Sequence, residues 1–101
     1  MSERSTYLKS WSNIKIAQKK AIEYLGKDAT LYKSTTQDKK YMILDPKNNK
    51  WIHFGAFGME DYTKHHDDDR RRRYLARATK IKGNWKDNPY SPNNLSIHIL
   101  W

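Results

Sequence analysis

Four consecutive arginines, residues 70–73, directly follow three consecutive aspartates, residues 67–69. A charge block of this kind is typical of disordered tails. The residues after the block favour a folded structure, because apolar side chains recur there at helical spacing. These side chains are Tyr74, Leu75, Ala78 and Ile81. The sequence therefore predicts a basic helix that begins near Asp67, with aspartates at its N-cap and first turn, and ends at Gly83.

The composition indicates one small folded domain. The chain has 101 residues, which leaves room for a single modest core. Charged residues make up 31% of it and its mean hydropathy is −1.08. The aromatic content of 13% argues against disorder, since large rings are costly to leave in water. We therefore expect a core built on aromatic side chains more than on Leu and Val.

The net charge of +9 and the isoelectric point near 9.8 point to a polyanionic partner. Residues 1–50 carry eleven basic and five acidic side chains, and residues 51–101 carry nine and six. The positive charge is thus spread along the chain and is not confined to a tail. Nucleic acid is the simplest such partner, ahead of an acidic protein surface or an anionic lipid.

Three function classes find no support in the sequence. The chain contains no cysteine, which excludes disulfides, thiol catalysis and thiolate zinc sites. No Ser lies in a nucleophile-elbow context, and the segment 53–58 lacks the Lys and Ser/Thr of a phosphate-binding loop. No apolar run approaches the roughly 20 residues of a membrane span, and no signal peptide is visible. We expect a non-enzymatic protein with no cofactor and no membrane span, which is not secreted.

The rest of the chain is predicted to form a small antiparallel sheet and two further helices. The first five residues are polar and expected to be mobile. A helix is expected from about Ser12 to Leu25, capped by Gly26. Its apolar face combines Tyr7, Trp11, Ile14, Ala21 and Leu25. Its lysines, Lys15, Lys19 and Lys20, lie mostly off that face and are either solvated or contact a phosphate or a partner.

Three strands are expected at residues 30–34, 40–44 and 50–54, the last two joined by a turn at residues 45–49. Gly55 and Gly58 punctuate a loop that can approach another segment closely. Ser91 and Pro92 suit the start of a short closing helix over residues 93–101. Its side chains Leu95, His98, Ile99 and Trp101 are expected to seal the core. The predicted fold is α+β in one domain, with residues 1–39 as an N-terminal extension and residues 40–101 as its core.

Residues 40–101 resemble a family of small basic proteins encoded by large double-stranded-DNA viruses of algae and protists and by some phages. The matching positions are Lys40, Tyr41, Pro46, Ile52, His53, Phe54, Gly55, Asp61, Tyr62, Thr63, His65, Asp67, Arg70, Tyr74, Arg77, residues 90–92 and residues 100–101. The family has no activity to carry over. The resemblance implies a viral origin and a role in genome handling or virion structure. It places the protein in the cytoplasm or nucleus of the host cell and in the virion.

An arginine ridge along the central helix is the leading candidate binding site. It consists of Arg70, Arg73, Arg77 and Lys80, with Arg72 at its flank. Arginine suits phosphate because its planar fork donates two hydrogen bonds and stays charged. The alternative is a solvated helix face partly neutralised by the neighbouring aspartates. Arg71 falls inside the apolar arc, so we expect it to be partly buried and paired with a carboxylate such as Asp61.

A second group of residues could serve catalysis or structure. It comprises His53, Asp61, His65, His66, Asp67 and Asp69, with His53, Asp61, His65 and Asp69 as weak metal-ligand candidates. A metal held by such ligands could activate water in a small nuclease. In the alternative, His53, Phe54, Gly55, Asp61, His65, Arg71 and Tyr74 form a structural motif, and the aspartates cap the helix. One of four aromatic residues, Trp51, Trp85, Tyr90 or Trp101, could be free to stack on a base.

The sequence thus favours non-specific binding of nucleic acid, with DNA expected, through the arginine ridge. A minor capsid protein that cements acidic protein surfaces is the first alternative. A small metal-dependent nuclease is the second.

Overall fold

The computed structural model describes residues 8–101. Its elements are α2 (Ile14–Leu25), β1 (Tyr32–Lys33), β2 (Lys39–Asp45), β3 (Lys50–Ala56), α3 (Tyr62–His65), α4 (Asp68–Ala78), a 3-10 turn (Trp85–Asp87), α5 (Pro92–Leu95) and a π-helical turn (Ser96–Leu100). The expected mobility of residues 1–5 and the place of Tyr7 on the first helix lie outside the described residues. Within residues 8–101, no helix is long and apolar enough to span a membrane.

The predicted α+β fold is confirmed. The three strands form one antiparallel sheet in the order β1-β2-β3. The hairpin between β2 and β3 pairs Leu44 with Trp51 and closes over the turn predicted from its sequence. Asp45 begins this turn by accepting a hydrogen bond from the backbone N–H of Lys47, and Asn49 takes a positive φ of 62°. Both roles suit these residue types, because Asp bonds nearby backbone and Asn tolerates the left-handed region.

The core is mainly aliphatic, so the expectation of an aromatic core is wrong. Its fully buried side chains come from the sheet, from α2 and from residues 91–101, which we call the C-terminal segment. They are Ala17, Ala21, Tyr41, Ile43, Phe54, Leu95, Ile99 and Leu100. Four other aromatic residues lie partly buried at the edge of the core: Tyr24, Phe57, Tyr90 and Trp101. The hydroxyl of Tyr and the indole N–H need a polar partner, which the boundary of a small core supplies more easily than its centre.

Helix α2 begins and ends as its sequence predicts. The side chain of Asn13 caps it by accepting from the backbone N–H groups of Lys15 and Ile16, and Gly26 follows its last turn. The buried face matches the predicted one in part: Ala21 is buried as expected, whereas Ala17 is buried without having been predicted and Ile14 is exposed. These two alanines lie four residues apart on one face and let the neighbouring C-terminal segment approach closely.

The C-terminal segment departs from regular α-helical spacing. Ser91 caps α5 as predicted, and its Oγ accepts from the backbone N–H of Asn94. Ser96–Leu100 then forms a π-helical turn, in which the N–H of Trp101 donates to the carbonyl of Ser96. This wider turn rotates the later side chains, since each bond spans five residues. Leu95, Ile99 and Leu100 are therefore buried, while His98 stacks on Tyr24 and Trp101 stacks on Tyr74.

Helix α4 starts where predicted but ends five residues before Gly83. Asp67 is its N-cap and accepts from the backbone N–H groups of Asp69 and Arg70. At its other end, the Asn93 side chain donates to the carbonyl of Ala78, and the Trp85 indole donates to the carbonyl of Ile81. The Asn93 bond satisfies a terminal carbonyl of α4, and the Trp85 bond holds the segment that follows the helix. Ile81 consequently lies outside the helix and is exposed.

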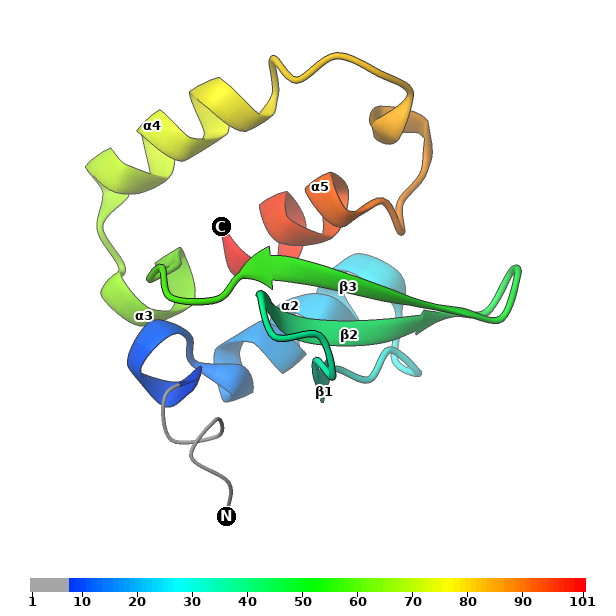
Figure 1. Cartoon of the computed structure of the whole chain (residues 1–101). Coiled ribbons are helices and arrows are strands. Elements are labelled where there is room, and N and C mark those ends of the chain that lie inside the picture. The colour runs from blue at the N-terminus through cyan, green and yellow to red at the C-terminus, as the bar shows by residue number, and fades with distance from the viewer. Residues whose placement is uncertain (1–7) are drawn as a thin grey trace.

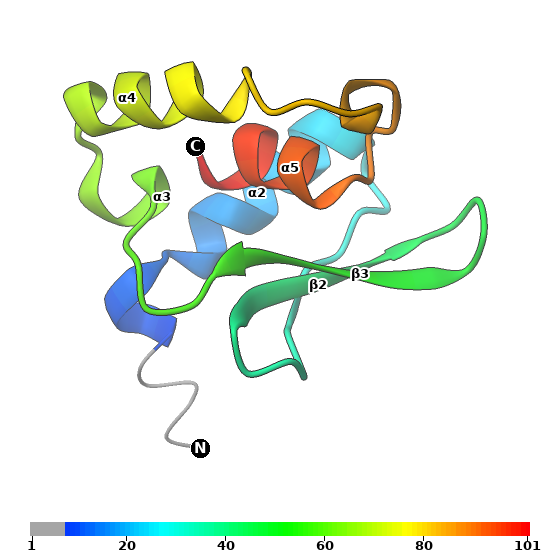
Figure 2. The same cartoon turned by 45° about the horizontal axis from the view of Figure 1, so that its top comes forward.

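The C-terminal segment lies between α4 and the sheet (Figures 1 and 2). Helix α4 forms an outer layer of the molecule, and Ala78 is the one buried residue along it. On the other side of the C-terminal segment, α2 and the sheet complete the core. The N-terminal helix α2 and strand β1 are thus integral to the same fold as residues 40–101.

Candidate functional site

The arginine ridge faces a groove between α4, the end of β3 and the C-terminal segment. The groove has a cavity of about 290 Å³. Arg70, Arg73 and Arg77 line it from one face of α4, and Lys40 lines it from β2. Two other members of the predicted site do not line the groove: Arg72 pairs with Asp69 on the exposed side of α4, and Lys80 follows the helix. The predicted ridge is therefore reduced to three arginines that share one cavity.

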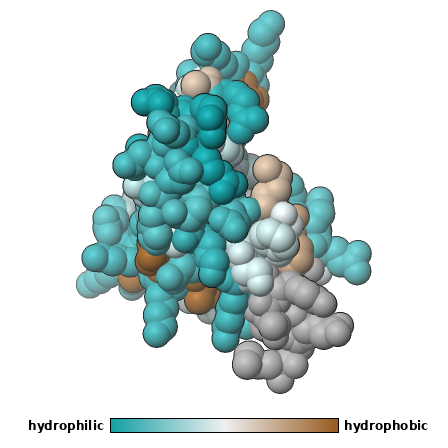
Figure 3. Space-filling model, turned by 90° about the vertical axis from the view of Figure 1, so that its left-hand side faces the viewer, coloured by the Kyte–Doolittle hydropathy of each residue, from teal (hydrophilic) through white to brown (hydrophobic). Residues whose placement is uncertain are grey.

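Apolar groups form most of the remaining lining of the groove, together with Glu60 and Ser96. Leu100, Gly55 and Met59 line it, as do the rings of Tyr74 and Trp101. The two rings stack with their centroids 4.2 Å apart and their planes 10° apart. The left-hand side of Figure 1, where α3 and the beginning of α4 lie, is covered mostly by hydrophilic side chains (Figure 3).

Gly55 lets the end of β3 approach the C-terminal segment. Its φ is +83°, and a Cβ atom built there would lie 2.7 Å from Leu100 Cδ1. Such a contact is far inside van der Waals distance and the backbone conformation is one that side chains disfavour, so this position requires glycine. The expectation that this glycine permits a close approach is confirmed.

The charges around the groove are incompletely compensated. Arg70 Nη1 lies 3.7 Å from Glu60 Oε1, and both side chains are partly exposed. Arg73 and Arg77 form no salt bridge within the described part of the chain. Two guanidinium groups therefore face the groove without an acidic partner.

The predicted pairing of Arg71 with Asp61 is wrong. Arg71 is exposed, its Nε donates to the main-chain oxygen of Trp101 at 2.7 Å, and its guanidinium lies over the ring of Tyr62. Asp61 is completely buried and pairs with Lys40, whose Nζ lies 2.9 Å from Asp61 Oδ2. Helical spacing predicts on which side of the helix Arg71 lies. It does not predict which cation pairs with the buried Asp61, because that depends on the surrounding fold.

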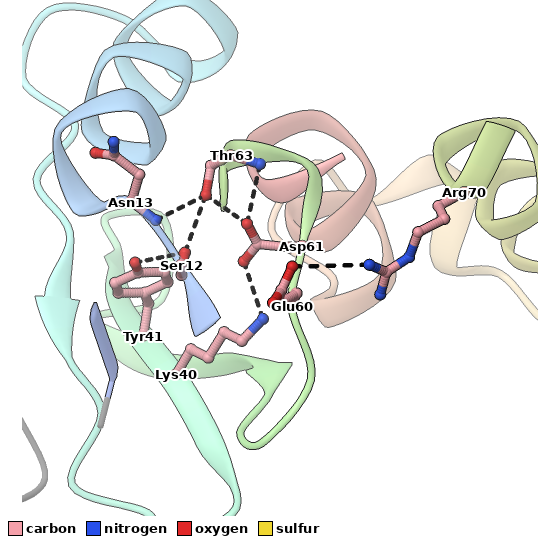
Figure 4. A network of polar contacts seen from close by, with 8 residues as sticks. All are labelled: Ser12, Asn13, Lys40, Tyr41, Glu60, Asp61, Thr63 and Arg70. Carbon is pink, nitrogen blue, oxygen red and sulfur yellow. Dashed lines mark hydrogen bonds and ion pairs between the residues drawn. The ribbon is translucent and has the colours of Figure 1, made fainter. Parts of the chain in front are cut away.

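Asp61 and Lys40 belong to a buried polar network (Figure 4). The Thr63 hydroxyl donates to Asp61 Oδ1, and the backbone N–H of Thr63 donates to the same oxygen. Thr63 Oγ1 in turn lies 3.1 Å from Ser12 Oγ, which accepts from the Tyr41 hydroxyl. The network joins the segment before α2, strand β2 and the start of α3, so its role is to hold these elements together.

Burial shifts the pKa of two groups in this network, Lys40 and Tyr41. Burial lowers the pKa of Lys40, and the neighbouring Asp61 carboxylate opposes that shift. Burial also raises the pKa of Tyr41, whose hydroxyl therefore stays protonated and can donate to Ser12. Because Lys40 and Asp61 neutralise each other, their pair adds little net charge to the groove.

The histidines and aspartates of the second predicted group lie in separate hydrogen-bonding roles. His53 Nδ1 pairs with Ser34 Oγ at 2.7 Å, and His65 Nδ1 accepts from the backbone N–H of Asp67 at 2.9 Å. Both oxygens of Asp61 are already bonded and inaccessible. Among residues 8–101, no group of three or more His, Asp or Glu side chains could hold a metal ion. His53, His65 and Asp61 thus take part in hydrogen bonds within the fold, as the structural interpretation of these residues expects.

The four candidate stacking residues differ in accessibility. Trp85 donates its indole N–H to Ile81, Tyr90 packs against the core, and Trp101 stacks on Tyr74. Trp51 is 47% exposed on the hairpin, where its ring meets Tyr32 edge-on. It is therefore the most accessible of the four, and it lies away from the arginine groove.

The chain is similar to an uncharacterised family. Residues 29–78 match the family model described as "Family of unknown function (DUF5754)". The match begins at Ala29, earlier than the resemblance at Lys40, and covers β1, the hairpin, α3 and α4. Comparisons with curated proteins and with solved structures found no match.

Sequence reasoning missed the groove residues that lie outside α4. Lys40, Glu60 and Leu100 come from three separate segments, and only the fold brings them beside the arginines. One signal was present for Lys40, because it is a charged residue at the start of an apolar strand. This position indicates that Lys40 has an unusual environment, but it does not predict that Asp61 is the partner of Lys40.

Proposed function

We propose that this protein binds nucleic acid non-specifically and without catalysis, through Arg70, Arg73 and Arg77 of α4. The observation that supports the proposal best is the groove itself, which three arginines line and in which Arg73 and Arg77 have no acidic partner among the described residues. A self-repelling set of cations is costly unless an anion joins it. The net charge of +9 favours the same class of partner.

The mechanism of binding is counterion release. Arginine and lysine side chains replace the cations condensed on the phosphates, so affinity falls steeply as salt rises. Backbone contacts of this kind fix the position of a protein on nucleic acid but carry no sequence information. Together with the resemblance to viral proteins, this suggests a role in genome packaging or in the virion, and hence a location in the infected host cell.

The cement-protein alternative predicts an N-terminal helix that orders only on a partner. Helix α2 instead buries Ala17 and Ala21 in the core of the single chain. This packing favours the nucleic-acid proposal, although the same arginines would also suit an acidic protein surface.

A salt titration of binding to fluorescent duplex and single-stranded DNA tests the proposal. We expect log affinity to fall linearly with log salt, and the slope to shallow by about 1 for each arginine removed in Arg70/Arg73/Arg77→Ala. Absence of binding at low salt, or affinity that does not change with salt, would contradict the proposal.

A further inference from the structure

The arginine groove has a wall opposite its arginines as well as a charged surface. Arg70, Arg73 and Arg77 project from successive turns of α4 toward the same cavity of about 290 Å³. The opposite wall consists of Gly55 and the C-terminal residues Leu100 and Trp101. An open track for a phosphate backbone requires no such wall. The geometry therefore suits a small chemical group of a ligand that enters the cavity.

The balance of charges around the groove indicates the charge of the group that would enter it. Lys40 is neutralised by Asp61 at 2.9 Å, and Arg70 is partly neutralised by Glu60 at 3.7 Å. Arg73 and Arg77 remain, in no salt bridge with any residue of the described chain. Two uncompensated positive charges match a dianion. The apolar wall strengthens the attraction, because it lowers the local dielectric around the charges.

We propose that the groove binds a phosphate monoester, deepening the proposed nucleic-acid function on which this inference rests. A phosphate monoester carries a charge of roughly −1.5 to −2 at neutral pH, whereas each diester of a nucleic-acid backbone carries about −1. Its oxygens accept the paired N–H donors of arginine. The monoester can come from the 5′ end of a strand or from a free nucleotide, which share this chemistry.

The test compares DNA strands that differ at their 5′ end. One fluorescent oligonucleotide carries a 5′ phosphate and a second, of the same sequence, carries a 5′ hydroxyl. A third carries a 5′ hydroxyl and two additional nucleotides, so that its total charge equals that of the first. All three are titrated at about 0.1 M salt, where exposed charges more than about 10 Å apart are largely screened. Adenosine 5′-monophosphate and adenosine serve as competitors.

We expect the 5′-phosphorylated strand to bind about tenfold more tightly than both hydroxyl strands. This preference is lost in Arg73→Ala and Arg77→Ala and retained in Arg72→Ala, a matched control because Arg72 pairs with Asp69 outside the groove. Displacement by adenosine 5′-monophosphate, but not by adenosine, would show that the monoester suffices without a strand. Lack of displacement by either, with the preference intact, would assign the site to strand ends.

Two results would overturn the inference while leaving the proposed function intact. In the first, all three strands bind with the affinity that their total charge dictates. In the second, the preference survives in Arg73/Arg77→Ala, which would place the recognition of the 5′ end elsewhere. Absence of binding to every strand would instead contradict the proposed function as well.

Discussion

Lys40 and Asp61 form an ion pair in which both side chains are almost inaccessible, with exposed fractions of 3% and 0%. Burying two charges is costly, and the direct contact at 2.9 Å together with further hydrogen bonds to the carboxylate offsets that cost. The backbone N–H and hydroxyl of Thr63 both donate to Asp61. Removal of the carboxylate would leave the ammonium group of Lys40 buried without a partner.

We expect Asp61→Ala to lower the free energy of unfolding by about 3–5 kcal/mol, because breaking a buried pair leaves an uncompensated charge. Arg72→Ala removes half of the exposed pair with Asp69 and is expected to cost less than about 1 kcal/mol. Urea unfolding of both variants at neutral pH measures the difference. Equal losses in the two variants would show that the buried pair has no special role.

His65 is held in its neutral form by its surroundings. Its Nδ1 accepts the backbone N–H of Asp67 and so carries no proton. Its Nε2 is buried, without a partner in the described chain. Burial lowers the pKa of His65, and the positive charge of Arg70 adds to that shift. The folded state therefore binds a proton less readily than the unfolded state does.

This imbalance predicts that stability depends on pH near neutrality. A lowered histidine pKa stabilises the fold above the ordinary value of 6.5, and that contribution is lost as the pH falls below it. His65→Asn should weaken this pH dependence, because asparagine does not titrate. Its Oδ1 can still accept the backbone N–H of Asp67, so the hydrogen bond is kept. His98 accounts for a remaining part, because burial lowers its pKa too. Urea unfolding between mildly alkaline and mildly acidic pH tests this, and an identical dependence in His65→Asn would contradict it.

Helix α4 depends on side chains of other elements more than on its own burial. Tyr74 stacks on Trp101, Arg71 donates to the main-chain oxygen of Trp101, and Asn93 bonds the helix end. Ala78 is its one buried residue. A helix with so little apolar surface gains most of its stability from these few attachments.

We expect Trp101→Ala to loosen α4 more than the rest of the fold. A stacked aromatic pair contributes about 0.5–1.5 kcal/mol beyond its burial, so its loss raises the population of the locally opened state by a factor of roughly 2 to 13. Hydrogen exchange should accelerate in α4 more than in α2 and β2. Trp51→Ala is the control, because Trp51 is exposed on the hairpin. Uniform acceleration across all elements would indicate global destabilisation instead.

Local signals in the sequence predicted the elements well. The hairpin, the end of α2 at Gly26, the cap of α5 and the start of α4 follow from turn residues and capping residues that act within a few positions. The π-helical turn of Ser96–Leu100 was missed, because it arises from packing and has no short-range signature. The early end of α4 was missed for a related reason: Asn93, which donates to the carbonyl of the last helical residue, lies in a later segment.

The candidate site was only partly predictable. Helical spacing placed Arg70, Arg73 and Arg77 on one face, and the structure has all three lining one groove. Spacing alone could not show that this face meets the C-terminal segment across a cavity. It also could not separate these arginines from Arg72, whose partner Asp69 lies on the same helix. Long-range packing therefore decided which members of the charge block share a site.

At the scale of the whole molecule, the question is whether net charge alone or the groove accounts for binding. The chain carries +9, and exposed basic residues lie on α4 and also on α2. Lys15 and Lys19 are exposed on that helix, away from the residues that line the groove. A protein that bound only through net charge would lose the same affinity wherever two positive charges were removed.

The most direct measurement compares Arg73/Arg77→Ala with Lys15/Lys19→Ala, two variants of equal net charge, in salt titrations against one DNA strand. We expect the arginine variant to lose affinity strongly. Its slope of log affinity against log salt should become shallower by about 2, one for each lost phosphate contact. The lysine variant should keep a slope close to that of the wild type. Equal losses of affinity in both variants would contradict binding through the groove and would show that net charge alone accounts for binding.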